Sequence, residues 1–345
     1  MRTKDQVLAM GLALALGGAA YAEFTPGHVF VSYAAAKFCG EAGTNWDQIW
    51  EIDPETGESS LFVELSGEDC GYVSGLAFTP HGSRLRVSLA IKNQIVEFDS
   101  EGHMTVLYDS TDGISGPFGF NNLAYDRQQP PNFYVLNAGT GRILRFPPDG
   151  SPPTVFADSS DGILGSGSIA FAADGDLYFA NLSGDWYLQR ITPEGEGFLF
   201  DSYGNTICPS ALTADDAGGV YVGLVGVGVA EVYRYIAADP TSKTLLASGF
   251  PFGGFHVMTM FPDQTGIYVA TSSEELYALN PANGEVTQLA HLAGAPNTSP
   301  YGIAVVPARP SMIPALSTWG VVVLTLLGLA LGTVTIQREH ATATT

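Results

Sequence analysis

The chain has 345 residues, of which 46% are hydrophobic and only 14% are charged, so it can bury a large core. Its formal net charge of −21 creates a field that repels phosphate backbones, which argues against nucleic acid as a partner. The 41 glycines and 21 prolines predict many turns. Cys39, Cys70 and Cys208 have no CxxC spacing, so they support neither a zinc site nor a thioredoxin-like motif.

Residues 1–22 have the three parts of a secretory signal peptide. Arg2 and Lys4 precede an apolar stretch over residues 7–20, and Ala20-Tyr21-Ala22 is a small-x-small cleavage site. We therefore expect cleavage before Glu23. An uncleaved N-terminal anchor is the alternative, and either interpretation places residues 23 to about 310 outside the cytoplasm.

Residues 23–307 contain a repeat of about 45 residues, which predicts four short strands per unit. The first strand of each unit is an apolar triplet, found at residues 76–78, 123–125, 169–171, 212–214, 258–260 and 303–305. Turn signals such as Asp53-Pro54-Glu55-Thr56-Gly57 separate the third strand from the fourth. This pattern predicts an all-β propeller with four-stranded blades.

The two ends of the repeat region complete each other. The first unit, from His28, lacks an innermost strand, and the last copy, residues 301–306, is an innermost strand with no blade after it. Together they predict a split closing blade, which gives a six-bladed ring with no open sheet edge between its ends. By blade number and strand pattern, the chain resembles the broad group of NHL, YVTN and gluconolactonase-like propellers.

The segment 308–345 predicts a linker, a transmembrane helix and a short tail. Residues 313–336 carry no charge and are long enough to span a bilayer, with Trp319 at the interface and Arg338 as the cytoplasmic stop. A buried core helix is the alternative. The motif resembles the IPTL-CTERM protein-sorting domain of Gram-negative bacteria, with pattern IPTLxxWG, through Ile313, Pro314, Leu316, Trp319 and Gly320. Ala315 replaces the usual Thr. This resemblance implies envelope sorting machinery as a partner, and a protein anchored in the inner membrane or sorted to the cell surface after export.

Ligand sites in propellers gather where inter-blade loops meet the starts of the inner strands. We expect this face to look outward from the membrane and to bind a protein or a glycan. The candidates at its axial mouth are Asn121, Asn122, His256 and Tyr301, and the 34–46 loop adds an aromatic lip through Phe38 and Trp46. Two alternatives stay open: the polar groups hydrogen-bond loop backbone, and the loop packs over its own blade.

Catalytic and metal-binding patterns are sparse in this sequence. Gly165-Ser166-Gly167 lacks the GxSxG spacing of a nucleophile elbow, and the six histidines are scattered. Asp112-Gly113 and Asp161-Gly162 are turn-forming pairs before they are metal ligands. We therefore assign no catalytic residue, no metal ligand and no cofactor, although scattered Asp side chains and loop carbonyls would suit a weak calcium site.

Two functions follow from these observations. The first is a non-enzymatic binding or interaction module in the bacterial cell envelope. The alternative is a metal-dependent hydrolase or lactonase of the gluconolactonase type. The resemblance implies a Glu, two Asn and an Asp around a divalent metal; Asn122 matches one Asn, but no Glu and Asp occupy matching repeat positions.

The cysteines predict one disulfide in the oxidising envelope. Cys39 and Cys70 lie in loops on the same face of the predicted propeller, so we expect them to pair. Cys208 belongs to a predicted loop three blades away, and we expect it to remain unpaired.

Overall fold

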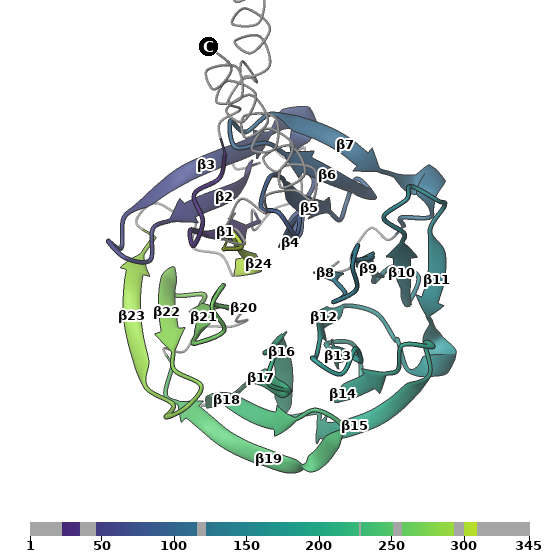
Figure 1. Cartoon of the computed structure of the whole chain (residues 1–345), viewed down its shortest axis with the longest axis vertical. Helices are drawn as coiled ribbons and strands as arrows, with labels where there is room; N and C mark the ends of the chain where they lie inside the picture. Colours follow the sequence, from purple (N-terminus) through teal and green to yellow (C-terminus); the bar gives the residue numbers. More distant parts are fainter. Residues whose placement is uncertain are drawn as a thin grey trace, which may run out of the picture. The chain divides into compact units, whose positions relative to one another are not determined.

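A computed structural model describes residues 23–34, 46–115, 122–227, 229–250, 257–292 and 300–308. These residues form six antiparallel sheets of four strands each, arranged as a ring of blades (Figure 1). The predicted six-bladed propeller with four-stranded blades is therefore confirmed. Within the described residues no helix is long and apolar enough to cross a membrane. The predicted signal peptide, transmembrane helix and sorting motif lie outside the described residues.

Five blades are continuous in sequence, and the chain runs through each of them from the inner strand to the outer strand. Blade 1 is β4 (Val73–Phe78), β5 (Leu85–Leu89), β6 (Gln94–Phe98) and β7 (Met104–Tyr108). Blade 2 is β8 (Leu123–Tyr125), β9 (Phe133–Asn137), β10 (Arg142–Phe146) and β11 (Thr154–Ala157). Blade 3 is β12 (Gly167–Phe171), β13 (Leu177–Asn181), β14 (Trp186–Ile191) and β15 (Gly197–Gly204).

The remaining continuous blades have the same order. Blade 4 is β16 (Ile207–Ala214), β17 (Gly219–Gly226), β18 (Val229–Ile236) and β19 (Asp239–Ser248). Blade 5 is β20 (Val257–Met260), β21 (Ile267–Ala270), β22 (Glu275–Leu279) and β23 (Val286–His291). Among the described residues, three short 3₁₀ helices lie in connectors between blades: η1 (Gly67–Asp69), η2 (Ser110–Asp112) and η3 (Ser159–Asp161).

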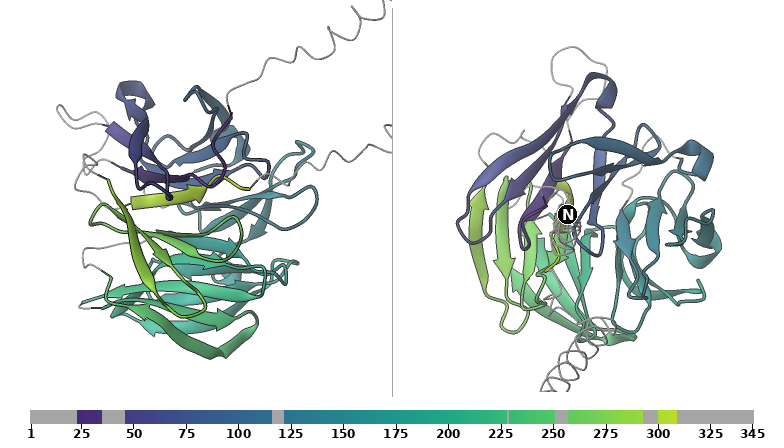
Figure 2. Two further views of the ribbon diagram at one scale, coloured as in Figure 1. Left: turned by 60° about the vertical axis from the view of Figure 1, so that its left-hand side comes forward. Right: turned by 45° about the horizontal axis from the view of Figure 1, so that its top comes forward.

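Blade 6 closes the ring and combines both ends of the described chain. Its sheet has the order β24-β1-β2-β3, with β1 (Val29–Tyr33), β2 (Trp46–Ile52), β3 (Ser59–Ser66) and β24 (Pro300–Val305). Val31 of β1 pairs with Ile303 of β24, and Figures 1 and 2 show the yellow β24 beside the purple β1. The predicted split closing blade is confirmed.

The hydrophobic core is divided among the spaces between neighbouring blades. Each of the six interfaces has its own cluster of buried side chains. At the closing interface, the rings of Phe24, Phe30 and Phe78 pack edge to face, with centroids 4.9 to 5.4 Å apart. Aromatic pairs of this kind add stabilising free energy beyond that of burying apolar surface, so they stabilise the packing of blade 6 against blade 1.

The chain direction gives the ring two different faces. Each inner strand begins on the face where connectors arrive from the preceding blade, which we call the loop face. It ends on the opposite face, where the hairpin turns to the second strand lie, which we call the turn face. Trp46, expected in the 34–46 loop, is instead the first residue of β2 and pairs with Ser66. Cys208, expected in a connecting loop, belongs to β16, because the β16–β17 ladder continues as far as Ile207 and Gly226.

Closure of the ring can be tested at Gly302. A Cβ built on Gly302 lies 3.0 Å from Leu76 Cγ, the Leu76 nitrogen and Ser32 Oγ, all of which belong to the closing interface. We predict that Gly302→Val lowers the free energy of unfolding by roughly 1–3 kcal/mol, because overpacking forces the two blades apart. Urea unfolding measures this. Ser60→Val, on the exposed surface of β3, is the control; equal stability of the two variants would contradict the prediction.

Candidate functional site

A cavity of about 450 Å³ lies on the axis of the ring, and the inner strands of all six blades line it. The lining residues on the inner strands, or directly before one in the case of Asn122, are 76–78, 122–125, 168–171, 212–214, 257–260 and 302–305. Each inner strand is hydrogen-bonded to a neighbour on one side only, so its other edge offers backbone N–H and C=O groups to the cavity. The inner strands thus line the cavity mainly with uncharged polar backbone groups, and apolar side chains lie between these groups.

Small side chains explain why the centre is hollow. The middle residue of every inner-strand triplet is small, at Ala77, Ala124, Ala170, Thr213, Thr259 and Ala304. Blades converge toward the axis, so larger residues there would collide. The hydroxyls of Thr213 and Thr259 come from neighbouring blades, and both residues line the cavity.

The cavity extends to the turn face. Beyond the ends of the inner strands, its lining includes Thr79, Pro80, Gln129, Gln264 and Pro307. The sequence pattern pointed to the loop face alone, and a cavity that reaches the opposite mouth was not predicted. The residues of this rim follow the strand ends in hairpin turns, where the sequence indicates only turn formers.

Asn122 lines the cavity and also connects two blades. Its side-chain oxygen accepts a hydrogen bond of 3.3 Å from the Ile169 N–H of blade 3, and its carbonyl accepts one of 2.9 Å from the Leu136 N–H. The amide therefore satisfies a donor on the free edge of the neighbouring inner strand. This contact corresponds to the backbone-bonding alternative that the sequence left open.

Asp126 is the only carboxylate among the described residues that line the cavity. Its oxygens accept hydrogen bonds from the N–H groups of Gln128 and Asn132, the Asn132 side-chain amide and the Tyr134 hydroxyl, at 3.2, 2.8, 2.6 and 3.3 Å. Burial, and then the charge of Asp126, raise the pKa of Tyr134. Four internal donors thus occupy a carboxylate that would otherwise be the acid or base of the cavity.

Arg127 joins three blades on the turn face. Its guanidinium donates 3.3 Å hydrogen bonds to the carbonyls of Phe171 and Asp215 and forms an ion pair with Asp216. Gln264 of blade 5 then accepts a hydrogen bond from the Asp216 N–H. Burial lowers the pKa of Arg127. Its contacts hold neighbouring turns in place beside the cavity rim.

The two Asp-Gly repeats on the loop face are turn formers, as expected. In η2, Asp109 and Asp112 form a capping box; Asp158 and Asp161 do the same in η3. The following Gly113 and Gly162 adopt φ of 86° and 88°. These carboxylates accept backbone N–H groups, which is the geometry of a helix cap.

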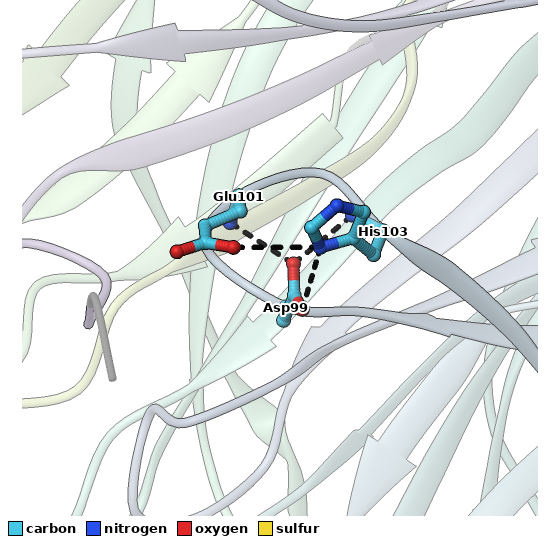
Figure 3. A group of neighbouring side chains, drawn as sticks. All are labelled: Asp99, Glu101 and His103. Carbon is cyan, nitrogen blue, oxygen red and sulfur yellow. Dashed lines mark hydrogen bonds and ion pairs between the residues drawn. The ribbon is translucent and has the colours of Figure 1, made fainter. Parts of the chain in front are cut away.

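One group of three side chains has the composition of a metal site (Figure 3). Asp99, Glu101 and His103 share the β6–β7 turn of blade 1, and they are the only such group among the described residues. Asp99 accepts 3.0 Å hydrogen bonds from the N–H groups of Glu101 and His103. The His103 backbone bond, above all, holds the pKa of Asp99 below its usual range. This geometry is that of a turn, and 73% of the His103 side chain is exposed.

Tyr301 lies on the loop face, next to a residue that the sequence pattern did not single out. Its ring packs against that of Tyr72, with centroids 5.0 Å apart and planes tilted by 51°. Asp47, only 1% exposed, accepts the Tyr72 N–H at 2.7 Å. The only sequence signal for an unusual backbone conformation at this position is the Cys70-Gly71-Tyr72 segment directly before an inner strand.

The cysteines agree with part of the prediction. Cys70 is disulfide-bonded and Cys208 is free, whereas Cys39 lies outside the described residues, so the Cys39–Cys70 pairing stays a prediction. Cys208 lies in β16 rather than in a loop, and burial raises the pKa of its thiol to about 11. Phe38, Asn121 and His256 also lie outside the described residues, and the side chain of Trp46 is not described.

Comparisons with known proteins identify the fold. No protein-family model and no curated protein matches the chain. Among solved structures, one from a nidogen/laminin complex has a TM-score of 0.62 at 16% identity, covering 82% of this chain and 100% of that one. Virginiamycin B lyase from Staphylococcus aureus has a TM-score of 0.51 at 14% identity, covering 80% and 92%. A putative gluconolactonase has a TM-score of 0.51 at 15% identity, covering 67% and 80%. The chain shares the six-bladed propeller fold with these proteins.

Asn122 gives a test of its structural role. We predict that Asn122→Ala lowers the free energy of unfolding by about 1 kcal/mol, because the Ile169 N–H loses its acceptor. Asn122→Asp keeps an acceptor oxygen and should recover most of the loss. Urea unfolding compares the three chains, and an unchanged stability in Asn122→Ala would contradict the assignment.

The capping carboxylates predict acid sensitivity. Hydrogen bonds from Thr111 lower the pKa of Asp109, and those from Ser160 lower that of Asp158. A depressed folded-state pKa stabilises the fold above the unfolded value of about 3.9, and the gain is lost as pH falls through the folded value. The urea concentration at the unfolding midpoint should therefore decrease as the pH is lowered below about 4. The fall should be less steep in Asp109→Asn/Asp158→Asn than in Glu194→Gln, a control turn acid; identical slopes would contradict this.

Proposed function

We propose that the chain is an exported β-propeller that acts as a binding or interaction module in the bacterial cell envelope. The signal features of residues 1–22 and the apolar segment 313–336 support export and a membrane anchor. The IPTLxxWG resemblance supports handling by envelope sorting machinery. Under this proposal the loop face is turned toward a protein or glycan ligand.

The observation that carries the binding function is the state of Asp126. It is the one carboxylate on the described lining of the axial cavity, and internal donors surround it. General acid–base catalysis needs a group within hydrogen-bond reach of the substrate. A cavity lined by backbone groups and threonine residues instead suits the binding of an uncharged ligand. The nidogen/laminin structure also shows this fold within a protein–protein complex.

The alternative is a metal-dependent lactonase, and Asn122 is the observation that favours it. The amide lines the cavity, as the gluconolactonase resemblance implies for a metal-binding Asn. Its side-chain oxygen, however, already accepts the Ile169 N–H. We therefore retain this activity as the outcome that would overturn the proposal.

Lactone hydrolysis separates the two functions. We predict no turnover by the purified protein with calcium, zinc or manganese, and no stoichiometric transition metal. Asn122→Ala and His256→Ala are assayed beside the unmodified chain, and Thr105→Ala, on the outer strand of blade 1, is the control. Turnover that collapses in either variant but not in the control would replace the binding function with lactonase activity.

A further inference from the structure

The Tyr72–Tyr301 pair lies on the loop face, where blade 6 meets blade 1. Tyr72 directly precedes β4 of blade 1, and Tyr301 is the second residue of β24 in blade 6. Both residues are half-buried, and their hydroxyls are hydrogen-bonded to each other. Because both inner strands begin on this face, the two rings come from neighbouring blades and meet there, with centroids 5.0 Å apart.

The backbone of Tyr72 is strained. Its φ is 63°, in the left-handed region that a bulky residue rarely adopts. Strain of this kind persists where surrounding contacts fix it, and it is concentrated at ligand sites. A glycine would adopt the same backbone without that strain, so the presence of a tyrosine points to a use for the ring.

Several contacts hold this conformation. The buried carboxylate of Asp47 accepts the N–H groups of Gly71 and Tyr72 at 2.9 and 2.7 Å. The Ala90 N–H donates to the Tyr72 carbonyl at 3.1 Å, and Cys70 is disulfide-bonded. Burial, and then the hydrogen bond with Tyr301, raise the pKa of Tyr72, so its phenol stays neutral. The ring is therefore pre-positioned, which lowers the entropic cost of binding.

The charges nearby favour a cation. Glu68 and Asp69 are exposed on η1, immediately before this segment, and Lys92 donates to the Glu68 carbonyl, which leaves one net negative charge among these three residues. The whole chain carries −21. Tyrosine rings attract ammonium and guanidinium groups through their negative faces, and an acidic field strengthens that attraction.

The same molecule already contains this kind of recognition. The ammonium of Lys243 lies 4.7, 4.9 and 5.8 Å from the ring centroids of Tyr203, Tyr233 and Tyr235. It also pairs with Asp201 at 2.9 Å. Tyrosine rings of β15 and β18, beside a carboxylate of β15, thus hold a lysine of β19.

We propose that Tyr72 and Tyr301 form a site for a lysine or arginine side chain of a partner protein. This inference rests on the proposed binding function and specifies its ligand chemistry. The partner would present a basic segment to the loop face, with one cation placed against the tyrosine pair and the exposed acids attracting the rest.

The probe is a short peptide with lysine at alternate positions, titrated calorimetrically into the full-length chain in mild detergent. The same peptide with acetylated lysines tests the need for charge. We expect the lysine peptide to bind and the acetylated peptide not to bind. Tyr301→Leu should weaken binding about tenfold, and Tyr301→Phe, which keeps the ring, should bind within about twofold of the unmodified chain.

Two control variants separate the loss of this tyrosine pair from the loss of any half-buried tyrosine and from the relief of backbone strain elsewhere. Tyr187→Leu removes another half-buried tyrosine, in blade 3, and should leave the affinity unchanged. Tyr72→Gly removes the ring together with its strained φ, and should weaken binding without lowering Tm by more than a few degrees. Ala238→Gly relieves a similar φ of 63° on the turn face and should bind normally.

Three results would overturn the inference: no binding of the lysine peptide, equal binding of the acetylated peptide, or equal weakening in Tyr187→Leu and Tyr301→Leu. Binding of a neutral oligosaccharide that is lost in Tyr301→Leu, without peptide binding, would replace the cation with a sugar. Each of these leaves the binding function intact if lactone turnover is absent. Lactone turnover with normal peptide binding would instead overturn the proposed function alone.

Discussion

The ladder between β1 and β24 is the interaction on which the rest of the structure depends. It joins strands separated by nearly the whole described chain, with Val31 opposite Ile303. Without it, blade 6 would lose its innermost strand and blade 1 would face no complete neighbour. The ladder also brings Ser32 beside Gly302 and Tyr301 against Tyr72. It gathers Phe24, Phe30 and Phe78 into one interface between blades 6 and 1.

Closing the ring has a chemical consequence at the axis. Six inner strands point their free backbone edges inward, and small or apolar side chains of those strands line most of the cavity between them, with Asn122, Asp126, Gln129 and Gln264 as the polar exceptions. The one carboxylate on the described lining is bound by internal donors. Charge is instead carried by the connecting segments, where Asp53, Asp99 and Asp109 accept backbone N–H groups. Asp126 is thus the only charged side chain on the described lining, and most of the acidic side chains lie away from the cavity.

Local patterns predicted the fold because each one repeats. The triplets such as Leu76-Ala77-Phe78 became inner strands, and the Asp-Gly pairs became capped connectors. The site was less predictable. Asp47 binds Tyr72 across 25 residues, and Arg127 reaches Asp215 across 88, so neither contact leaves a local signature. The extension of β16 to Ile207 was missed because Pro209 and Ser210 resemble a loop, although the β17 ladder pairs with Pro209.

Native-state hydrogen exchange of the β1 and β24 amides tests the closing ladder most directly. If the ladder holds the ring together, these amides exchange only on global unfolding, with the same protection as amides of the β12–β13 ladder inside blade 3. Exchange through a local opening, at a markedly lower free energy than that of blade 3, would contradict the account. In that case the two ends would separate while the other blades remain folded, and the contact between Tyr72 and Tyr301 would not be fixed.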